Sequence, residues 1–178
     1  MSGLAAGDTV YISGGPAGET KTYTLAAAWK PKSGAAGNPI TYQIGQDSAH
    51  NGTIVIYRPA GGSFIDSQVV YNGALHDVRI SGDAGDGQRH IRLSGCTHLC
   101  LDVTSGLAQT LRWYFGYIDC GVVLTVMAFQ NSSFVEFDHL KWRVEDPNGG
   151  VSLTLSFNGS TWKDNRIHDC YVECPTDG

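Results

Sequence analysis

Apolar and polar residues alternate along most of this chain in short runs, and clusters of Gly, Asn, Asp and Pro separate the runs. Alternation with a period of two is typical of strands that bury one face, and the separating residues favour turns. The pattern predicts strands at residues 10–12, 39–44, 54–56, 69–71 and 78–80. Residues 23–29, which include three consecutive alanines, fit either a helical turn or a strand.

The alternation returns at a nearly constant interval. One series advances in steps of 22 residues and consists of Val69, Ile91, Trp113 and Val135. A second series advances in steps of 24, 21 and 23 residues and consists of Ile56, Ile80, Leu101 and Leu124. The next apolar position, Trp162, comes 27 residues after Val135, and an inserted turn at residues 146–150 accounts for the longer step. Residues 117–120, 138–141 and 166–170 form a third alignment.

Intervals of this length leave no room for a long helix between strands and favour an all-β solenoid. The Leu frame of leucine-rich repeats is absent, and a β-sandwich would not predict two regular series. A parallel β-helix does predict them, because each coil places like residues above like residues. We therefore expect coils of about 22 residues, with Ile91, Trp113, Val135 and Trp162 stacked on one interior wall.

Composition agrees with one turn-rich β domain. The chain has 178 residues, of which 42% are apolar and 16% charged, with 23 glycines. A net charge of −5 without a basic stripe argues against a nucleic-acid partner. No apolar run is long enough to cross a bilayer, so we expect no membrane partner either. The first residues do not read as a signal peptide, which fits a cytoplasmic or virion-borne chain, or one whose leader was cut away.

The five cysteines are odd in number, which a complete set of internal disulfides cannot use. Each C-x3-C pair on one strand would be too far apart to form a bridge. We expect small buried side chains that fill the coil interiors, and a bridge between coils, such as Cys100 with Cys120, stays as an alternative. The five positions are Cys96, Cys100, Cys120, Cys170 and Cys174.

Three stretches resemble a known family. Residues 7–12 read Gly-Asp-Thr-Val-Tyr-Ile, residues 33–42 form a Gly-rich loop that leads into a strand, and residues 161–170 contain Asn-Arg-Ile-His-Asp. They resemble the start and the coils of right-handed parallel β-helix proteins of the pectate-lyase-like superfamily. The resemblance implies one β-helix domain over residues 1–178, with an N-terminal cap and first strands at 1–50 and stacked coils at 51–178. Such proteins usually have more coils, so we expect a fragment or a short member.

Outward residues of neighbouring coils should form a ladder about 4.8 Å apart on one sheet face. Arg92, Tyr114, Glu136 and Lys163 would stack in it, with Arg112 beside Tyr114. An aromatic ring and charged groups in a row could bind a sugar chain, so these five are the candidate substrate-binding residues. The alternative is a solvated face whose charges pair between coils.

A second set of polar residues comes from the third alignment. Asp119, His139, Lys141 and His168 are candidate catalytic residues, because imidazole, ammonium and carboxylate groups could supply an acid and a base. Asp169 belongs to the same cluster, Asp138 and Asp164 lie nearby, and oxygen donors make Ca²⁺ a candidate cofactor. The superfamily's usual motifs, such as Gly-His-Gly and Arg-x-Pro-x-x-Arg, are missing. Residues 81–87 resemble a Ca²⁺ loop superficially, but we interpret them as an ordinary turn. No dedicated metal ligands are assigned.

The leading hypothesis is a secreted or phage-associated β-helix domain that engages a polysaccharide, at an extracellular location or on a virion surface. Whether it cleaves the chain, as a lyase or glycoside hydrolase, is left open. The alternative is a non-catalytic structural or adhesive module of a fibre or surface protein. The sequence does not distinguish a monomer from a trimer.

Overall fold

We describe a computed structural model of the chain, which covers residues 3–27, 29, 31–59, 64, 76–96, 113–122, 126–130, 134–144, 154–158 and 164–173. All the regular secondary structure in these ranges is β-strand. The strands are β1 Thr9–Ile12, β2 Thr20–Thr24, β3 Ile40–Ile44, β4 Thr53–Tyr57, β5 Val78–Ser81, β6 Ile91–Cys96, β7 Trp113–Gly116, β8 Ile118–Val122, β9 Val126–Gln130, β10 Val135–Asp138, β11 Lys141–Val144, β12 Thr154–Asn158, β13 Arg166–His168 and β14 Tyr171–Glu173. No helix that could cross a membrane occurs in this part of the chain.

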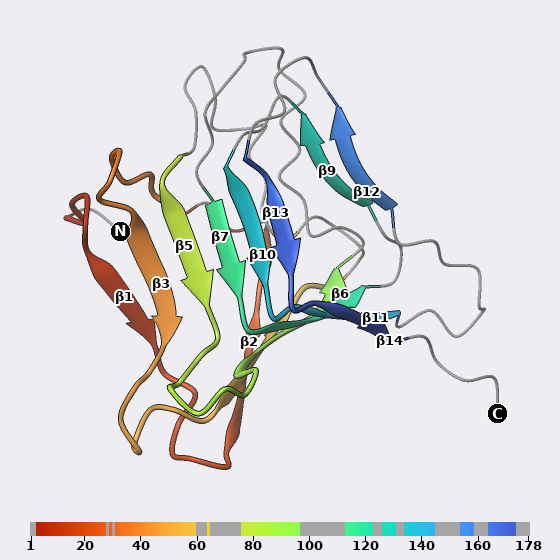
Figure 1. Ribbon diagram of the computed structural model, residues 1–178. Coiled ribbons are helices and arrows are strands. Elements are labelled where there is room, and N and C mark those ends of the chain that lie inside the picture. The colour runs from red at the N-terminus through yellow and green to blue at the C-terminus, as the bar shows by residue number, and fades with distance from the viewer. Residues whose placement is uncertain are drawn as a thin grey trace, which may run out of the picture.

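The strands form two parallel six-stranded sheets and one parallel pair. Sheet A has the order β1-β3-β5-β7-β10-β13, and sheet B has the order β2-β4-β6-β8-β11-β14. Strands β9 and β12 make the separate pair. The chain visits sheet A and sheet B in turn, so each passage adds one strand to each sheet (Figure 1). This is the arrangement of a parallel β-helix-like solenoid.

Single residues in the left-handed region make the corners between the last strands of sheets A and B. Tyr117 joins β7 to β8 with φ 52°, and His139 follows β10 with φ 54°. Asp169 follows β13 with φ 54°. A residue with a side chain adopts this region at some cost, so three successive corners of the same form indicate a geometry that the stacked strands impose. The corners place the side chains of these residues in one column.

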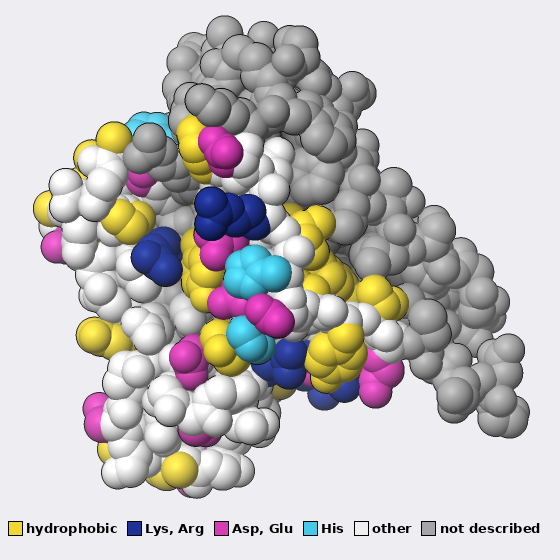
Figure 2. All heavy atoms as spheres, in the orientation of Figure 1, with side chains coloured by type: hydrophobic (Ala, Val, Ile, Leu, Met, Phe, Trp, Pro, Cys, Tyr) yellow, Lys and Arg dark blue, Asp and Glu magenta, His cyan; other side chains and the backbone are white. Residues whose placement is uncertain are grey.

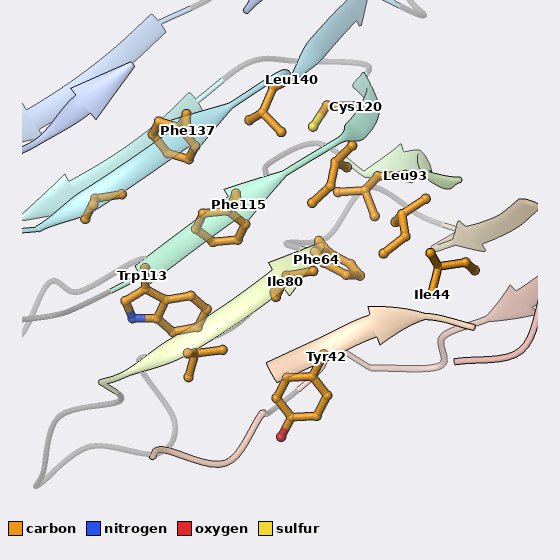
Figure 3. Close-up of a cluster of buried hydrophobic side chains, with 14 of the residues drawn as sticks. Tyr42, Ile44, Phe64, Ile80, Leu93, Trp113, Phe115, Cys120, Phe137 and Leu140 are labelled. Carbon is orange, nitrogen blue, oxygen red and sulfur yellow. The ribbon is translucent and has the colours of Figure 1, made fainter. Parts of the chain in front are cut away.

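Inward residues of neighbouring strands stack in the core (Figure 3). In sheet A, Tyr42, Ile80, Phe115 and Phe137 face one another in register. The Phe115 and Phe137 rings lie 5.4 Å apart with an interplanar angle of 27°. In sheet B, Ile56, Leu93, Cys120 and Trp142 form the matching column. Each coil therefore covers the apolar surface of the coil before it.

The predicted coil size of about 22 residues holds for one pair of coils, where β7 pairs with β10 and β8 with β11. The other neighbouring strands of sheet A are 30 to 38 positions apart. Val135 lies opposite Trp113 in sheet A, 22 positions apart. The stacking of Ile91 on Trp113 is wrong, because Ile91 belongs to sheet B and pairs with Ile54 and Ile118. The neighbour of Trp113 is Val78, which is 35 positions earlier. A constant interval could not reveal this, since Ile91 begins the second strand of the coil that starts at Val78.

The second predicted series is wrong for a similar reason. Ile56 pairs with Leu93 in sheet B, whereas Ile80 pairs with Phe115 in sheet A. The third alignment identifies the right corners, but its register is shifted. Asp119, Lys141 and Tyr171 lie opposite one another, rather than the first residues of the aligned stretches. The predicted positions Val69, Tyr71, Leu101, Leu124 and Trp162 lie outside the described residues.

The strands predicted at residues 10–12, 39–44, 54–56 and 78–80 are confirmed as β1, β3, β4 and β5. The segment around residues 23–29 contributes only the end of β2 as regular structure. Within residues 1–50, strands β1, β2 and β3 already belong to the two sheets. Among the cysteines, Cys120 is fully buried, as expected of an interior filler, and Cys170 is half-buried. The side chains of Cys96, Cys100 and Cys174 lie outside the description.

Candidate functional site

The outer face of sheet A carries two rows of polar side chains that follow from the strand register. The first row contains Thr41, Arg79, Tyr114, Glu136 and Arg166. The second row contains Gln43, Ser81, Gly116, Asp138 and His168. Basic, acidic and His side chains gather at the centre of this face (Figure 2). We call these ten residues the sheet A face.

Tyr114 lies flat on this face instead of pointing into solvent. A Cβ on Gly116 would overlap its ring and hydroxyl, so the glycine leaves the space that the ring occupies. The Tyr114 hydroxyl donates to Asp138 Oδ2 at 3.0 Å. The Arg79 guanidinium carbon lies 4.7 Å from the ring centroid, within the range of a cation–π contact. Burial, and then the bond to the Asp138 carboxylate, raise the pKa of Tyr114 well above its usual value, so the phenol stays protonated.

A groove runs along the start of strands β5, β7 and β10. Its volume is about 350 Å³, within the range of ligand pockets, roughly 300–1,000 Å³. One side is formed by the loop residues Gly37 and Pro39. The sheet A face contributes Arg79, Tyr114 and Glu136. The groove thus combines an aromatic ring, a cation and a carboxylate in one concave surface.

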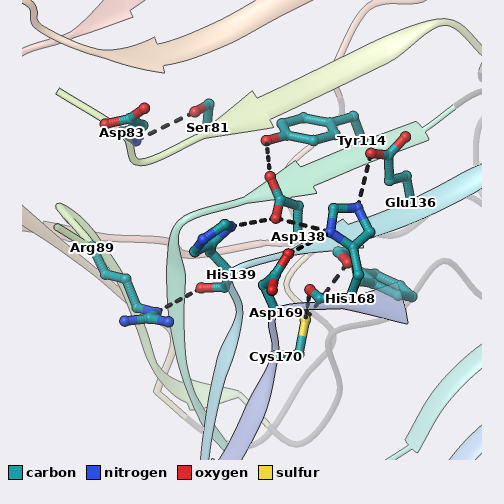
Figure 4. Close-up of polar contacts among 11 residues, drawn as sticks. Ser81, Asp83, Arg89, Tyr114, Glu136, Asp138, His139, His168, Asp169 and Cys170 are labelled. Atoms are coloured by element: carbon teal, nitrogen blue, oxygen red, sulfur yellow. Dashed lines mark hydrogen bonds and ion pairs between the residues drawn. The ribbon is translucent and has the colours of Figure 1, made fainter. Parts of the chain in front are cut away.

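His168 lies between three carboxylates (Figure 4). Its Nε2 is 3.1 Å from Glu136 Oε1. Its Nδ1 is 3.0 Å from Asp169 Oδ2 and 3.3 Å from Asp138 Oδ1. Hydrogen bonds to Asp169 and then to Glu136 raise the pKa of His168. The same contact with His168 lowers the pKa of Asp169.

His139 completes this group from the preceding corner. Its Nδ1 contacts Asp138 Oδ1, the oxygen that also faces His168. Its ring stacks on Tyr117 with 4.4 Å between centroids and 7° between planes. Arg89 Nε donates to the His139 backbone oxygen at 2.6 Å and crosses the corner from the loop before β6 (Figure 4). We call Asp138, His139, His168 and Asp169 the corner cluster.

The outer face of sheet B holds a different set of contacts. Arg143 Nε donates to Asp119 Oδ1 at 2.6 Å. Lys141 Nζ pairs with Glu173 Oε2 at 2.6 Å and lies 5.5 Å from the Tyr171 ring centroid. The hydrogen bond to Lys141 lowers the pKa of Glu173, and the same bond raises the pKa of Lys141. These pairs link successive coils at the surface.

The predicted ladder is partly correct. Tyr114 and Glu136 lie opposite each other on the sheet A face, as expected. The inclusion of Arg92 is wrong, since Arg92 is in sheet B opposite Asp119. Its expected place next to Tyr114 is taken by Arg79, which a 22-residue interval does not predict because the two residues are 35 positions apart. The outward position between the apolar Val78 and Ile80 was the available signal. Arg112 and Lys163 lie outside the described residues.

The predicted catalytic set falls on both sheets. His139 and His168 meet at Asp138 in the corner cluster. Asp119 and Lys141 lie opposite each other on sheet B, where each has an ion-pair partner. Sequence proximity suggested Asp138 only as a neighbour, whereas it is the residue that both imidazoles contact. The catalytic roles of the four residues stay a prediction.

Two groups bear on metal binding. Asp138, His139 and Asp169 each offer a donor atom, and these atoms all lie within 4.8 Å of one another. The loop at residues 81–87 is explained as turns, because Asp83 Oδ1 accepts a bond from the Gly85 amide and Asp86 Oδ1 from the Gln88 amide.

Comparison with family models, with curated proteins and with solved structures finds no match.

Proposed function

We propose that this chain binds a polysaccharide along the sheet A face, and that its fold is a right-handed β-helix of the pectate-lyase-like type. The observation that supports binding most directly is the groove where Arg79, Tyr114 and Glu136 meet. Parallel strands about 4.8 Å apart offer a repeating set of side chains to a repeating ligand. Such a ligand would place the protein outside a cell or on a virion surface.

The side chains of the groove suit sugar recognition. The exposed part of the Tyr114 ring gives an apolar surface on which a pyranose can stack, and its position is fixed by Gly116 and Asp138. Arg79 and Glu136 can donate to and accept from hydroxyl groups or carboxylates of the sugar. Because these groups are held by strands rather than by loops, little ordering is needed on binding.

The contacts of the predicted catalytic residues do not favour cleavage of a bound sugar chain. Binding without cleavage is therefore the better supported function. Asp119 and Lys141 already pair with Arg143 and Glu173, so a proton transfer by either would first break a close ion pair. His168 is surrounded by carboxylates that favour its charged form, which does not suit a general base.

Affinity electrophoresis and calorimetry against a panel of neutral and acidic polysaccharides would test the proposal. We expect binding to at least one of them, and at least tenfold weaker binding by Tyr114→Ala. Tyr57→Ala is the matched control, because Tyr57 is a half-exposed tyrosine on sheet B. Failure of the wild type to bind any member of the panel, or equal losses in the two variants, would overturn the proposal. Release of unsaturated uronate would show that a bound chain is also cleaved.

The rival function is a structural or adhesive module. The ion pairs that join successive coils on sheet B favour it, since Asp119 with Arg143 and Lys141 with Glu173 satisfy charges without a ligand. Absence of polysaccharide binding in a well-folded protein would select this function.

A further inference from the structure

We infer that the corner cluster, Asp138, His139, His168 and Asp169, is a binding site for a divalent first-row transition metal of the Zn²⁺ type. The inference does not depend on polysaccharide binding, because it uses the end of the sheet A face and the corner, outside the groove. It shares Asp138 and Asp169 with the Ca²⁺ suggestion from the sequence, but it adds two imidazole ligands and takes a different metal.

Donor atoms of Asp138, His139 and Asp169 lie within 4.8 Å of one another, and His168 is close to the two carboxylates of this set. His168 Nδ1 is 3.0 Å from Asp169 Oδ2 and 3.3 Å from Asp138 Oδ1, and His139 Nδ1 contacts the same Asp138 oxygen. A tetrahedral ion with bonds of about 2.0–2.2 Å separates its ligand atoms by roughly 3.3–3.6 Å. Small side-chain rotations would therefore bring these donors into a coordination shell.

Rigid elements hold the donors. Asp138 and His168 lie opposite each other at the ends of β10 and β13. His139 and Asp169 are the left-handed corner residues that come next, both with φ 54°. Two adjacent residues on each of two successive coils thus supply the whole set, and their relative position is fixed by the hydrogen-bonded ladder.

A second layer of contacts orients the ligands. Glu136 Oε1 is 3.1 Å from His168 Nε2, so that Nε2–H can donate to a carboxylate while Nδ1 faces the site. Carboxylate, imidazole and metal in this order are typical of protein metal sites. The second oxygen of Asp138, Oδ2, accepts a hydrogen bond from the Tyr114 hydroxyl (Figure 4). The His139 ring stacks on Tyr117.

The charge balance favours a divalent cation. Glu136, Asp138 and Asp169 bring three negative charges around two imidazoles, which are neutral when they act as ligands. An ion of charge +2 offsets most of this excess. Two imidazole donors and two carboxylates suit Zn²⁺ and related ions, whereas Ca²⁺ prefers six to eight oxygen ligands. Arg89 contacts the His139 backbone oxygen rather than a donor atom of the cluster.

Such an ion would stabilise the packing of the last described coil against the coil before it. Strands β13 and β14 have three residues each, and Ile167 and Val172 remain 44% and 47% exposed. Little apolar burial therefore holds this coil to the one before. Asp138 and His139 belong to one coil and His168 and Asp169 to the next, so one ion would join the two.

Calorimetry on metal-stripped protein with Zn²⁺ and Ca²⁺, and thermal unfolding with and without Zn²⁺, would test the site. We expect one Zn²⁺ per chain, a higher Tm with Zn²⁺, and much weaker Ca²⁺ binding. His168→Ala should bind Zn²⁺ at least tenfold more weakly, and Glu136→Gln about tenfold more weakly because it loses the outer contact. His50→Ala is the matched control, since His50 pairs with Asp47 at 2.7 Å elsewhere on the surface.

Several outcomes would overturn the inference. These are less than half an ion per chain, a preference for Ca²⁺, or equal losses in His168→Ala and His50→Ala. If His168→Ala does not fold, Co²⁺ in the wild type replaces it as the readout. Paramagnetically shifted ring protons from two imidazoles, assigned to His139 and His168, would support the site, and their absence would refute it.

Discussion

The ring of Tyr114 lies across Gly116 on the outer face of sheet A, in space that any larger residue at position 116 would fill. This relationship fixes the hydroxyl on Asp138 in the neighbouring strand, and so connects the groove to the corner cluster. A glycine inside a strand usually weakens it, but here the missing side chain gives the aromatic ring a place on the sheet.

Gly116→Ala should displace Tyr114 and break its bond to Asp138. The loss of a hydrogen bond to a charged acceptor predicts a decrease of about 1–3 kcal/mol in the free energy of unfolding. Denaturant unfolding measures it. In a Tyr114→Ala background the same substitution should cost less, because no ring is left to displace. Equal costs in both backgrounds would show that the overlap with Tyr114 is not the cause.

Arg79 and Arg92 give a direct test of which sheet face binds the ligand. Arg79 lines the groove and lies over Tyr114, whereas Arg92 is on sheet B opposite Asp119. We expect Arg79→Ala to weaken polysaccharide binding at least tenfold and Arg92→Ala to leave it nearly unchanged. Calorimetry with the polysaccharide bound by the wild type measures both. A larger loss in Arg92→Ala would move the binding face to sheet B.

The comparison of these two arginines shows what the sequence could predict. Alternation in the strand around Val78 and Ile80 correctly indicated which residues are buried, because that pattern depends only on local pleating. The partner of each strand depends on how many residues lie in the loops between them, and those numbers vary. Between Val135 and Trp113 no long insertion occurs, and there the interval gave the right pair.

The corner cluster was less accessible to sequence reasoning. His139 and His168 were singled out as polar residues near one another in an alignment, which is correct. Their meeting at Asp138 requires the left-handed corners at His139 and Asp169. His and Asp adopt this conformation more often than most residues with a side chain, but residue type alone does not show which of them forms a corner. The register shift of the third alignment follows from the same corners.

The core column in sheet A should be sensitive to truncation in its middle and tolerant at its end. Phe137 is fully buried and stacks on Phe115, so Phe137→Ala should lower the free energy of unfolding by about 3–5 kcal/mol. Ile167 faces Phe137 from the next strand but is 44% exposed, so Ile167→Ala should cost about 1 kcal/mol or less. Denaturant unfolding of both variants compares them. Similar losses would mean that β13 is packed as tightly as β10.

The pair between Lys141 and Glu173 predicts a pH dependence at the last strand of sheet B. The Lys141 ammonium lowers the pKa of Glu173, so the pair stabilises β14 fully above the usual carboxyl value of 4.5. This contribution is lost as the pH falls from there through the lowered pKa of the folded state. We expect the amides of Tyr171 and Glu173 to exchange faster with solvent in that acidic window.

Lys141→Met removes the cause of this shift. The pKa of Glu173, followed by carbon NMR of its carboxyl group, should rise towards 4.5, and the extra amide exchange of β14 in acid should no longer depend on this group. Lys21→Met, on β2 at the other end of sheet B, is the control and should leave the Glu173 titration unchanged. A Glu173 titration that is the same in wild type and Lys141→Met would mean that the pair does not persist in solution. In that case the contacts that hold the last coil would be those on the sheet A side, at Glu136, Asp138 and His168.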